Sequence, residues 1–154
     1  TRSLLIDRLN QMINQAERHE QYFVVMYLDL DGFKYVNDTY GHKCGDIVLQ
    51  GLADFLSKNT RQGDIVCRYG GEEFVILMPN ATQQDAYESA ERWRDEYSAT
   101  IFHFDGKDMQ ATFSAGVASY PLHGSTGESI LHAADKALYL SKTNGRNRVT
   151  LYNE

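Results

Sequence analysis

Apolar side chains recur along the chain with two spacings, one typical of helices and one typical of strands. Residues 3–18 show the helical spacing, and residues 22–28 form an unbroken apolar run, as in a strand that is covered on both faces. Residues 33–39 show a mixed pattern that predicts no element. The rest of the chain predicts, in order, a helix over 47–56, strands over 64–69 and 73–78, a helix that begins after Thr82, a hairpin that joins 101–104 to 109–119, a helix over 130–138 that ends at Asn144-Gly145, and a strand over 148–152.

This order of elements predicts a single α+β domain over residues 1–154. Strands mixed with helices form one sheet with helices packed on it, and a ferredoxin-like βαββαβ core with a central, mostly antiparallel sheet fits the order. No apolar stretch approaches the ~20 residues of a membrane span. Because the chain begins at Thr1 rather than Met, we expect a domain excised from a longer chain with an N-terminal sensory or regulatory region.

Charge and cysteine content narrow the possible ligands. The formal net charge is -6, which argues against general nucleic-acid binding, because such binding needs basic residues that displace counterions. An acidic chain that binds a phosphate substrate therefore needs a metal ion or a local basic cluster. Cys44 and Cys67 show no metal-ligand spacing, and we expect them to be buried or half-buried in a reducing compartment.

Two aspartates follow the first predicted strand. Alternation along a strand places Asp29 and Asp31 on the same side, and a carboxylate at such a boundary is costly to bury without a partner. Hard oxygen ligands at a strand end suit Mg²⁺, which binds carboxylates together with substrate phosphates. The alternative is that both are solvated loop residues, which is the usual case for an isolated Asp-x-Asp.

A glycine turn followed by two acids lies further along the chain. Gly70 and Gly71 at a hairpin tip permit positive φ and the close approach of a ligand. Glu72 and Glu73 then point to opposite sides of a strand, so that one can face a metal while the other has a different role. If the hairpin lies beside the first strand, Glu72 and Asp29 can share an ion. The alternative is a solvated turn with flanking charges.

Several blocks of the sequence together resemble the GGDEF domains of diguanylate cyclases. Gly70 to Phe74 matches the motif that names the family, in its Gly-Gly-Glu-Glu-Phe form. Further agreement, in the family's order and over nearly the whole chain, lies in residues 29–46, 112–117, 133–139 and 142–147. The family usually opens with Leu-Thr-Gly-Leu-x-Asn-Arg, of which only Thr1-Arg2 remains, with Thr where Asn is usual. The resemblance implies a fold like that of nucleotidyl cyclase catalytic domains.

The resemblance implies condensation of two GTP molecules into cyclic di-GMP, with release of two pyrophosphates, in bacterial second-messenger signalling. It assigns metal binding to Asp29, Glu72 and the carbonyl of Leu30, with two Mg²⁺ ions (or Mn²⁺) in each active half-site. Divalent ions neutralise the triphosphate and the charge that develops during in-line displacement. The resemblance makes Glu73 the general base for the attacking 3′-hydroxyl and Lys34 the phosphate contact that stabilises the transition state.

The same resemblance names the substrate contacts. Lys142 and Arg146 match the basic pair that binds the β- and γ-phosphates; alternatively, they complement the dipole at a helix C-terminus. Asn37 and Asp46 match the pair that reads guanine, whose N1–H and N2–H donors suit a carboxylate and whose remaining edge suits an amide. His42, between them in the sequence, is a further expected substrate-site residue.

An inhibitory site for the product is also implied. Arg61 and Asp64 match an Arg-x-x-Asp motif that, in many members of the family, binds cyclic di-GMP and inhibits the enzyme. Arg92 matches a secondary arginine of that site. A guanidinium can stack on guanine or grip its edge, and a carboxylate can accept hydrogen bonds from it. The alternative is an ordinary surface ion pair.

Partners follow from the same reasoning. One domain binds one GTP, so we expect catalysis to need a homodimer in which two half-sites face each other. We expect a cytoplasmic location in a bacterium, either free or as the cytosolic domain of a membrane-anchored protein, without membrane contact by this domain. Three alternatives are a degenerate GGDEF domain that senses GTP or cyclic di-GMP without turnover, a ferredoxin-like RNA-binding module, and a cyclase that acts on one ATP. The retained acids of the motif argue against a degenerate domain, and the acidic net charge argues against an RNA-binding module. The Asn37–Asp46 pair argues against a cyclase that acts on ATP.

Overall fold

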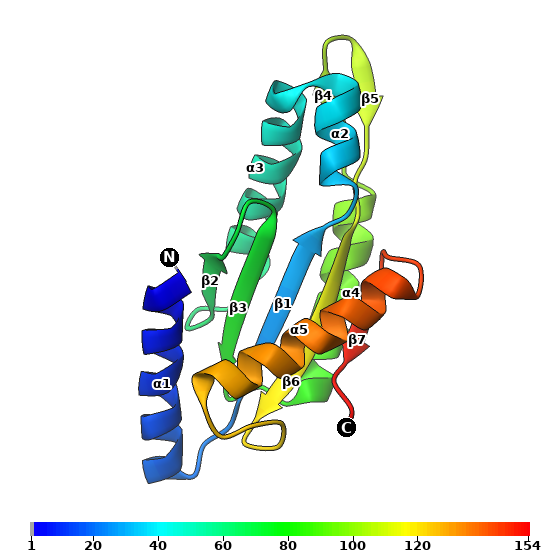
Figure 1. Cartoon of the computed structure of the whole chain (residues 1–154). Helices are drawn as coiled ribbons and strands as arrows, with labels where there is room; N and C mark the ends of the chain where they lie inside the picture. Colours follow the sequence, from blue (N-terminus) through cyan, green and yellow to red (C-terminus); the bar gives the residue numbers. More distant parts are fainter. Residues whose placement is uncertain (1) are drawn as a thin grey trace.

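The computed structural model describes residues 2–154 of the chain. Its helices and strands follow in the order α1 (Arg2–His19), β1 (Phe23–Leu30), α2 (Phe33–Tyr40), α3 (His42–Asn59), β2 (Ile65–Arg68), β3 (Glu73–Pro79), α4 (Gln83–Ser98), β4 (Phe102–Phe104), β5 (Lys107–Met109), β6 (Phe113–Tyr120), α5 (Gly127–Thr143) and β7 (Val149–Leu151). Figure 1 shows α5 and α1 on one side of a central sheet, with α3 and α4 behind it.

The central sheet contains β2, β3, β1, β6 and β7 in that spatial order. All neighbouring pairs are antiparallel except β6 and β7, which run parallel. The series β1, α3, β2, β3, α4, β6 is the βαββαβ order, so the predicted ferredoxin-like α+β fold with a mostly antiparallel sheet is confirmed. β1 lies in the middle of the sheet and leads directly into α2 at one end of the molecule (Figure 1).

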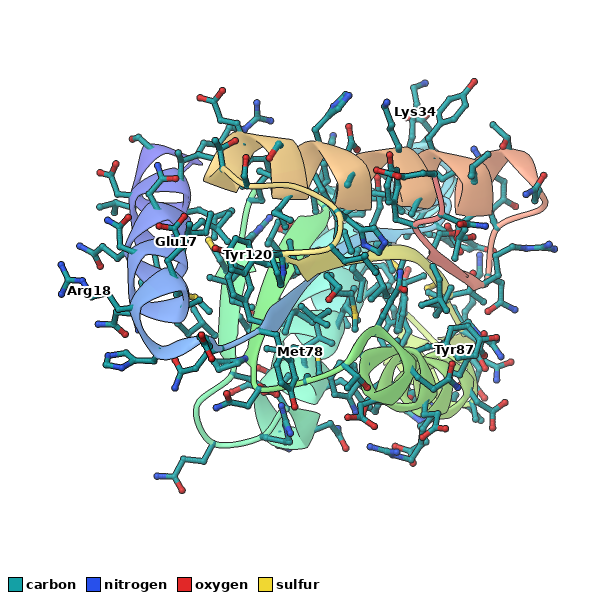
Figure 2. All side chains as sticks on the ribbon, turned by 90° about the horizontal axis from the view of Figure 1, so that it is seen from below. Glu17, Arg18, Lys34, Met78, Tyr87 and Tyr120 are labelled. Atoms are coloured by element: carbon teal, nitrogen blue, oxygen red, sulfur yellow. The ribbon has the colours of Figure 1, made fainter. Side chains whose placement is uncertain are left out.

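The two faces of the sheet pack against different helices. All residues of β1 are buried, which confirms a strand covered on both faces. Met26 points to the core that contains α3 and α4, and its neighbour Tyr27 points to the core beneath α1 and α5. In Figure 2, Met78 lies on the first side and Tyr120 on the second. Any side chain on β1 therefore reaches the helices of one face only.

Local hydrogen bonds explain where the later helices begin and end. α4 begins after Thr82, as predicted, in a capping box: Thr82 Oγ1 accepts from the N–H of Asp85 at 3.0 Å, and the Asp85 carboxylate accepts from the N–H of Thr82. A similar capping box opens α5. As predicted from Asn-Gly, α5 ends at Asn144, and Gly145 follows with φ 124°.

The predicted hairpin over residues 101–119 is wrong in one respect. Asp105 and Gly106, with φ of 54° and 76°, form a tight turn that pairs β4 only with β5. These two strands form a small sheet of their own, and the chain then enters β6, which joins the central sheet beside β1. Apolar alternation along the sequence does not show that a strand changes sheets.

A second difference is α2, which occupies residues for which the pattern predicts no element. None of its residues is fully buried, and its apolar face is short: only Phe33, Val36 and Tyr40 pack, partly buried, against the core, so the pattern does not stand out as a helix. Glycines mark both ends, because Gly32 with φ 69° and Gly41 with φ 92° adopt conformations that other residues rarely take. In addition, β1 extends two residues beyond the prediction, to Leu30, so that Asp29 lies inside the strand.

α5 lies unusually close to β6. A Cβ at Gly116 would overlap the backbone of Ala134 and Leu138, so only glycine permits this approach. Ser141 Oγ donates a hydrogen bond to the carbonyl of Ala115 at 2.8 Å, which fixes the last turns of α5 on the sheet. Within residues 2–154, no helix has the length and apolar character that a membrane span requires.

Candidate active site

A cleft of about 320 Å³ opens where β1 ends. Four segments meet there: the end of β1, the start of α2, the turn before β3, and the C-terminal end of α5 with its following loop. The lining residues are Asp29, Leu30, Asp31, Gly32, Phe33, Lys34, Glu72, Lys142 and Arg146. All three residues predicted to bind metal and three predicted phosphate contacts are therefore brought together.

Asp29 is the buried acid of this cleft, with only 6% of its surface exposed. It pairs across the sheet with Glu73 on β3 and Ser114 on β6, on the face that α5 covers. Lys142 from α5 donates to Asp29 Oδ2 at 2.5 Å. Burial raises the pKa of the Asp29 carboxyl to about 6; Lys142 opposes this rise, and the charges of Glu72 and Glu73 add to it.

Glu72 is held against the end of β1 by its backbone. The N–H of Leu30 donates to the carbonyl of Glu72 at 3.1 Å, which places the glycine turn beside the strand, as the shared-ion hypothesis requires. Within the described residues, no group of three or more His, Cys, Asp or Glu side chains is arranged to hold a metal. The carboxylates of Asp29 and Glu72 with one carbonyl fit Mg²⁺, which completes its shell with water and substrate phosphates.

Glu73 starts β3 on the face of the sheet that α5 covers, where it is half-buried. Its carboxylate shares a hydrogen bond with the hydroxyl of Tyr27, whose pKa is raised by burial and by the charge of Glu73. A Cβ at Gly70 would lie 2.6 Å from Glu73 Oε1, so a side chain at position 70 would push the Glu73 carboxylate from its present place. A Cβ at Gly71 would meet open space among the described residues. Neither glycine adopts the positive φ that its lack of a side chain permits.

The basic residues of the cleft come from two helices. Lys34 lies in the first turn of α2, with 91% of its side chain exposed, and pairs with Asp38 at 3.2 Å. Lys142 lies in the last turn of α5, and Arg146 follows in the loop with φ 64°. These two positions also satisfy the helix-dipole alternative, and the contact of Lys142 with Asp29 adds a role that the dipole does not require.

Asp31 lines the same cleft, but its carboxylate is fully engaged by the protein. Oδ1 accepts from Ser114 Oγ at 2.7 Å, and Oδ2 accepts from Thr112 Oγ1 at 2.7 Å and from the N–H of Asn147 at 3.0 Å. The backbone N–H of Asp31 also donates to the carbonyl of Thr112. Of the two aspartates, Asp29 has the less engaged carboxylate, with Lys142 as its donor, and is the better suited to bind a metal.

The residues predicted to read guanine lie beside this cleft, on α2 and α3. Asn37 Oδ1 is buried and has no hydrogen-bond partner within residues 2–154. A Cβ at Gly45 would overlap this oxygen, so glycine at that position makes room for the amide. His42 and Asp46 are exposed in the first turns of α3. An unpaired buried amide oxygen is costly, and a donor on a ligand would satisfy it.

The predicted inhibitory residues lie away from the cleft. Asp64 Oδ2 accepts from the backbone N–H of Arg61 at 2.9 Å, and its Oδ1 lies 3.6 Å from the Arg61 guanidinium. That guanidinium also donates to the carbonyl of Pro79 at 3.1 Å, and 55% of the Arg61 side chain is exposed. Arg92 is exposed on α4, a different element. The structure thus brings Arg61 and Asp64 into contact with each other.

The comparison with known families agrees with this geometry. A family model described as diguanylate cyclase, GGDEF domain, matches residues 1–148. The chain belongs to the GGDEF domain family. It is 44% identical, over 97% of its length, to diguanylate cyclase A of Treponema denticola, and the match covers 40% of that protein. It is 39% identical, over 96% of its length, to the response regulator PleD of Caulobacter vibrioides, covering 33% of it. The chain thus spans less than half the length of these relatives.

Solved GGDEF domains superpose closely on this one. The GGDEF domain of DgcB from Caulobacter crescentus, solved in complex with c-di-GMP, has a TM-score of 0.93 and 33% identity, covering 99% of this chain and 91% of that one. The active GGEEF domain of a diguanylate cyclase from Vibrio cholerae has a TM-score of 0.91 and 31% identity, covering 100% and 97%. The predicted family and fold are confirmed.

Three features of this GGDEF domain were not predicted from the sequence. Tyr27 contacts Glu73. Because Tyr27 lies two residues before Asp29 in a buried strand, the two side chains share one face of the sheet, which the alternation of strand residues could have indicated. The hydrogen bonds of Asp31 join residues 81 to 116 positions apart in the sequence. Arg94 on α4 donates to Asn147 Oδ1 at 2.8 Å, again across 53 positions. No local pattern could predict these long-range contacts.

Proposed function

We propose that this GGDEF domain is a diguanylate cyclase that condenses two GTP molecules into cyclic di-GMP and releases two pyrophosphates. The observation that carries the proposal is the convergence of Asp29 and Glu72 on one cleft that also receives Lys34, Lys142 and Arg146. An acidic pair surrounded by cations suits a triphosphate bound through divalent ions. Family membership and relatives named as diguanylate cyclases support the same reaction.

Asp29, Glu72 and the carbonyl of Leu30 are the residues that would hold Mg²⁺ or Mn²⁺, with two ions in each half-site. When bound, divalent ions neutralise the triphosphate and the charge that develops on the transferring phosphorus. Asp29 is prepared for a cation, because its buried carboxylate is already compensated by Lys142. Lys142 would be free to contact phosphate oxygens if a bound cation compensated Asp29 in its place.

The remaining side chains divide the work of binding and proton transfer. Lys34 and Arg146 both line the cleft and contact the triphosphate, from α2 and from the loop after α5. Glu73 accepts the proton of the 3′-hydroxyl of one GTP as that oxygen attacks the α-phosphorus of the other, and pyrophosphate leaves. The hydrogen bond from Tyr27 orients the Glu73 carboxylate for this role.

Guanine is bound between α2 and α3. The buried, unpaired oxygen of Asn37 supports a polar ligand edge at this place, and the exposed carboxylate of Asp46 can accept from the N1–H and N2–H donors. His42, on the first turn of α3, lies near enough in the sequence to contribute to the same site. Adenine would offer Asp46 an unsuitable pattern and leave a polar group unpaired.

Two copies of the domain are needed, because each holds one GTP and the product contains two. Two half-sites therefore face each other in a two-fold arrangement during catalysis. Arg61, Asp64 and Arg92 form the inhibitory site for cyclic di-GMP, and the neighbouring structure that was solved with c-di-GMP supports a product-binding surface on this fold. All acids of the cleft are retained, which favours turnover over a sensor without activity.

Incubation with GTP and Mg²⁺, followed by chromatography for cyclic di-GMP, tests the proposal. The expected result is product formation, with a rate per protomer that rises with protein concentration. Glu73→Gln keeps the size of the side chain and should lower the rate about hundredfold or more, because a general base contributes 10²–10⁴-fold. Absence of product from the wild-type protein would contradict the proposal. An undiminished rate in Glu73→Gln would contradict the role of Glu73.

A further inference from the structure

The loop after α5 has an unusual backbone. Gly145, Arg146 and Asn147 have φ of 124°, 64° and 50°, three consecutive residues in the left-handed region. Only the first is glycine, so the conformations of Arg146 and Asn147 cost free energy unless surrounding contacts hold them. Such strain is kept in proteins where the surrounding structure over-determines the backbone, often at functional sites.

Contacts from three elements hold this loop. The N–H of Arg146 donates to the carbonyl of Ser141 at 2.9 Å, which ties the loop to α5. Arg94 on α4 donates to Asn147 Oδ1 at 2.8 Å and is itself held by an ion pair with Glu91. The third contact is the hydrogen bond from the N–H of Asn147 to Asp31 Oδ2 at 3.0 Å.

The contact with Asp31 differs from the other two because it reaches the metal-binding end of β1. Asp31 directly follows Leu30, and its carboxylate is oriented by the hydroxyls of Thr112 and Ser114, at 2.7 Å each. With both oxygens engaged, the side chain has one orientation, and the position of Asn147 is fixed relative to β1. The adjacent residue, Arg146, lines the cleft.

We propose that Asp31 is a positioning residue for the triphosphate: it holds the 145–147 loop in its left-handed conformation so that Arg146 faces the cleft. The inference rests on the proposed function, because Arg146 is taken there to contact the β- and γ-phosphates. Asp31 acts through Arg146 and touches neither substrate nor metal. Asp31 therefore contributes only to binding of the β- and γ-phosphates, which GTP has and GMP lacks.

Affinity measurements with two nucleotides test this role. 3′-Deoxy-GTP has no attacking hydroxyl and cannot be turned over, while GMP has no β- or γ-phosphate. In Asp31→Ala, the ratio of GTP-analogue affinity to GMP affinity should fall about tenfold, as expected for the loss of hydrogen bonds to a charged group. GMP affinity itself should stay within about twofold of wild type, because the guanine site is untouched. Asp54→Asn removes a negative charge from an exposed position on α3 and serves as the control for a change of net charge.

A conservative variant separates positioning from metal binding. In Asp31→Asn, the remaining oxygen can accept from Thr112 and Asn147, while the new NH₂ donates to Ser114 Oγ, whose hydroxyl rotates. The ratio should therefore recover to within about threefold of wild type, because the loop contacts survive. A metal ligand would instead lose its function in Asn as much as in Ala, and that result would overturn the proposal.

Coupling to Arg146 completes the test. In an Arg146→Ala background, adding Asp31→Ala should lower the ratio of GTP-analogue affinity to GMP affinity by less than about twofold. The further loss is small because both changes remove the same phosphate contact. Fully additive losses, or an unchanged ratio in Asp31→Ala, would overturn the inference. If Asp31→Ala does not fold, Thr112→Val removes one donor from the carboxylate and should lower the ratio in the same direction; a wild-type ratio there would overturn it. Failure of the proposed function is distinguishable, because it appears as wild-type protein that forms no cyclic di-GMP.

Discussion

The cleft at the end of β1 and the Arg61–Asp64 turn both carry charged residues with predicted roles, but they are built in different ways. Asp29 and Lys142 meet across 113 positions of sequence. In the turn, Asp64 accepts from the backbone of Arg61, three residues away, and only 1% of its side chain is exposed. The cleft exists only in the folded sheet, whereas the turn is organised by its own neighbours.

This difference has an energetic consequence. In the cleft, burial raises the pKa of Asp29 and the charge of Glu72 adds to the rise, so the fold holds acids together at a cost that a bound cation would offset. In the turn, by contrast, the buried Asp64 carboxylate accepts a backbone hydrogen bond from Arg61 and lies beside the guanidinium of the same residue. Substitutions in the cleft should therefore change activity and pH dependence strongly, and substitutions at Arg61 should act mainly on regulation.

The largest expected effect is on catalysis in the cleft. Glu72→Gln removes a metal-binding charge with little change in shape and should lower the rate of cyclic di-GMP formation about hundredfold or more. The matched control is Glu88→Gln on α4, an exposed residue that accepts a hydrogen bond from Gln84 on the same helix and should retain the wild-type rate. Equal rates in both variants would show that the acids of the cleft do not act together.

The next effect is on stability as a function of pH, in metal-free buffer. The folded pKa of Asp29, about 6, lies above its ordinary 3.8, so the folded state holds the proton more tightly than the unfolded state. This stabilisation is fully present at low pH and is lost as the pH rises through the folded value. Relative to Asp29→Asn, the wild type should lose about 2 kcal/mol between about pH 4 and pH 7. Urea unfolding measures this difference, and a constant difference across the range would contradict the burial argument.

A smaller effect is expected where α2 meets α3. Gly45→Ala would place a Cβ against Asn37 Oδ1, so the free energy of unfolding should fall by about 1–2 kcal/mol and GTP affinity should fall with it. In an Asn37→Ala background the amide is gone and only Phe33 Cε1, 3.3 Å from the new Cβ, remains close, so the same change should cost less or stabilise the helix by up to about 1 kcal/mol. A loss of the same size in both backgrounds, measured by chemical unfolding, would show that the two residues are not in contact.

The smallest effect on stability is expected at the turn. Arg61→Ala removes a half-exposed guanidinium but keeps the backbone N–H that binds Asp64, so the free energy of unfolding should change by less than about 1 kcal/mol. Inhibition by cyclic di-GMP should weaken, seen as a higher product concentration for half-maximal inhibition. Arg18→Ala on α1 is the control. Unchanged inhibition in Arg61→Ala would remove the regulatory role of this turn.

Much of the fold could be predicted because its signals are local. The apolar run of β1 and the capping residue Thr82 identify their elements directly. The segment with α2 is not predicted, since in a helix of only eight residues the partly buried Phe33, Val36 and Tyr40 leave a short apolar face. The separation of β4 and β5 from the central sheet depends on pairing between strands, which alternation does not encode.

The candidate site divides in the same way. The resemblance placed Asp29, Glu72 and Lys142 in one site, and the structure brings them to one cleft. It could not show that Lys142 pairs with Asp29, nor that Asp31 is engaged by donors from residues 112–114 and from the loop after α5. Such contacts depend on how closely α5 lies on β6, and this close approach is possible because Gly116 has no side chain.

The central claim is that Asp29 and Glu72 share the divalent ions that hold a triphosphate. Electron paramagnetic resonance with Mn²⁺ and saturating 3′-deoxy-GTP tests it most directly, by measuring bound Mn²⁺ per protomer. We expect two bound ions in the wild type and in Asp54→Asn, and affinity weaker by about tenfold or more in both Asp29→Asn and Glu72→Gln. Wild-type affinity for Mn²⁺ in these two variants would contradict the claim.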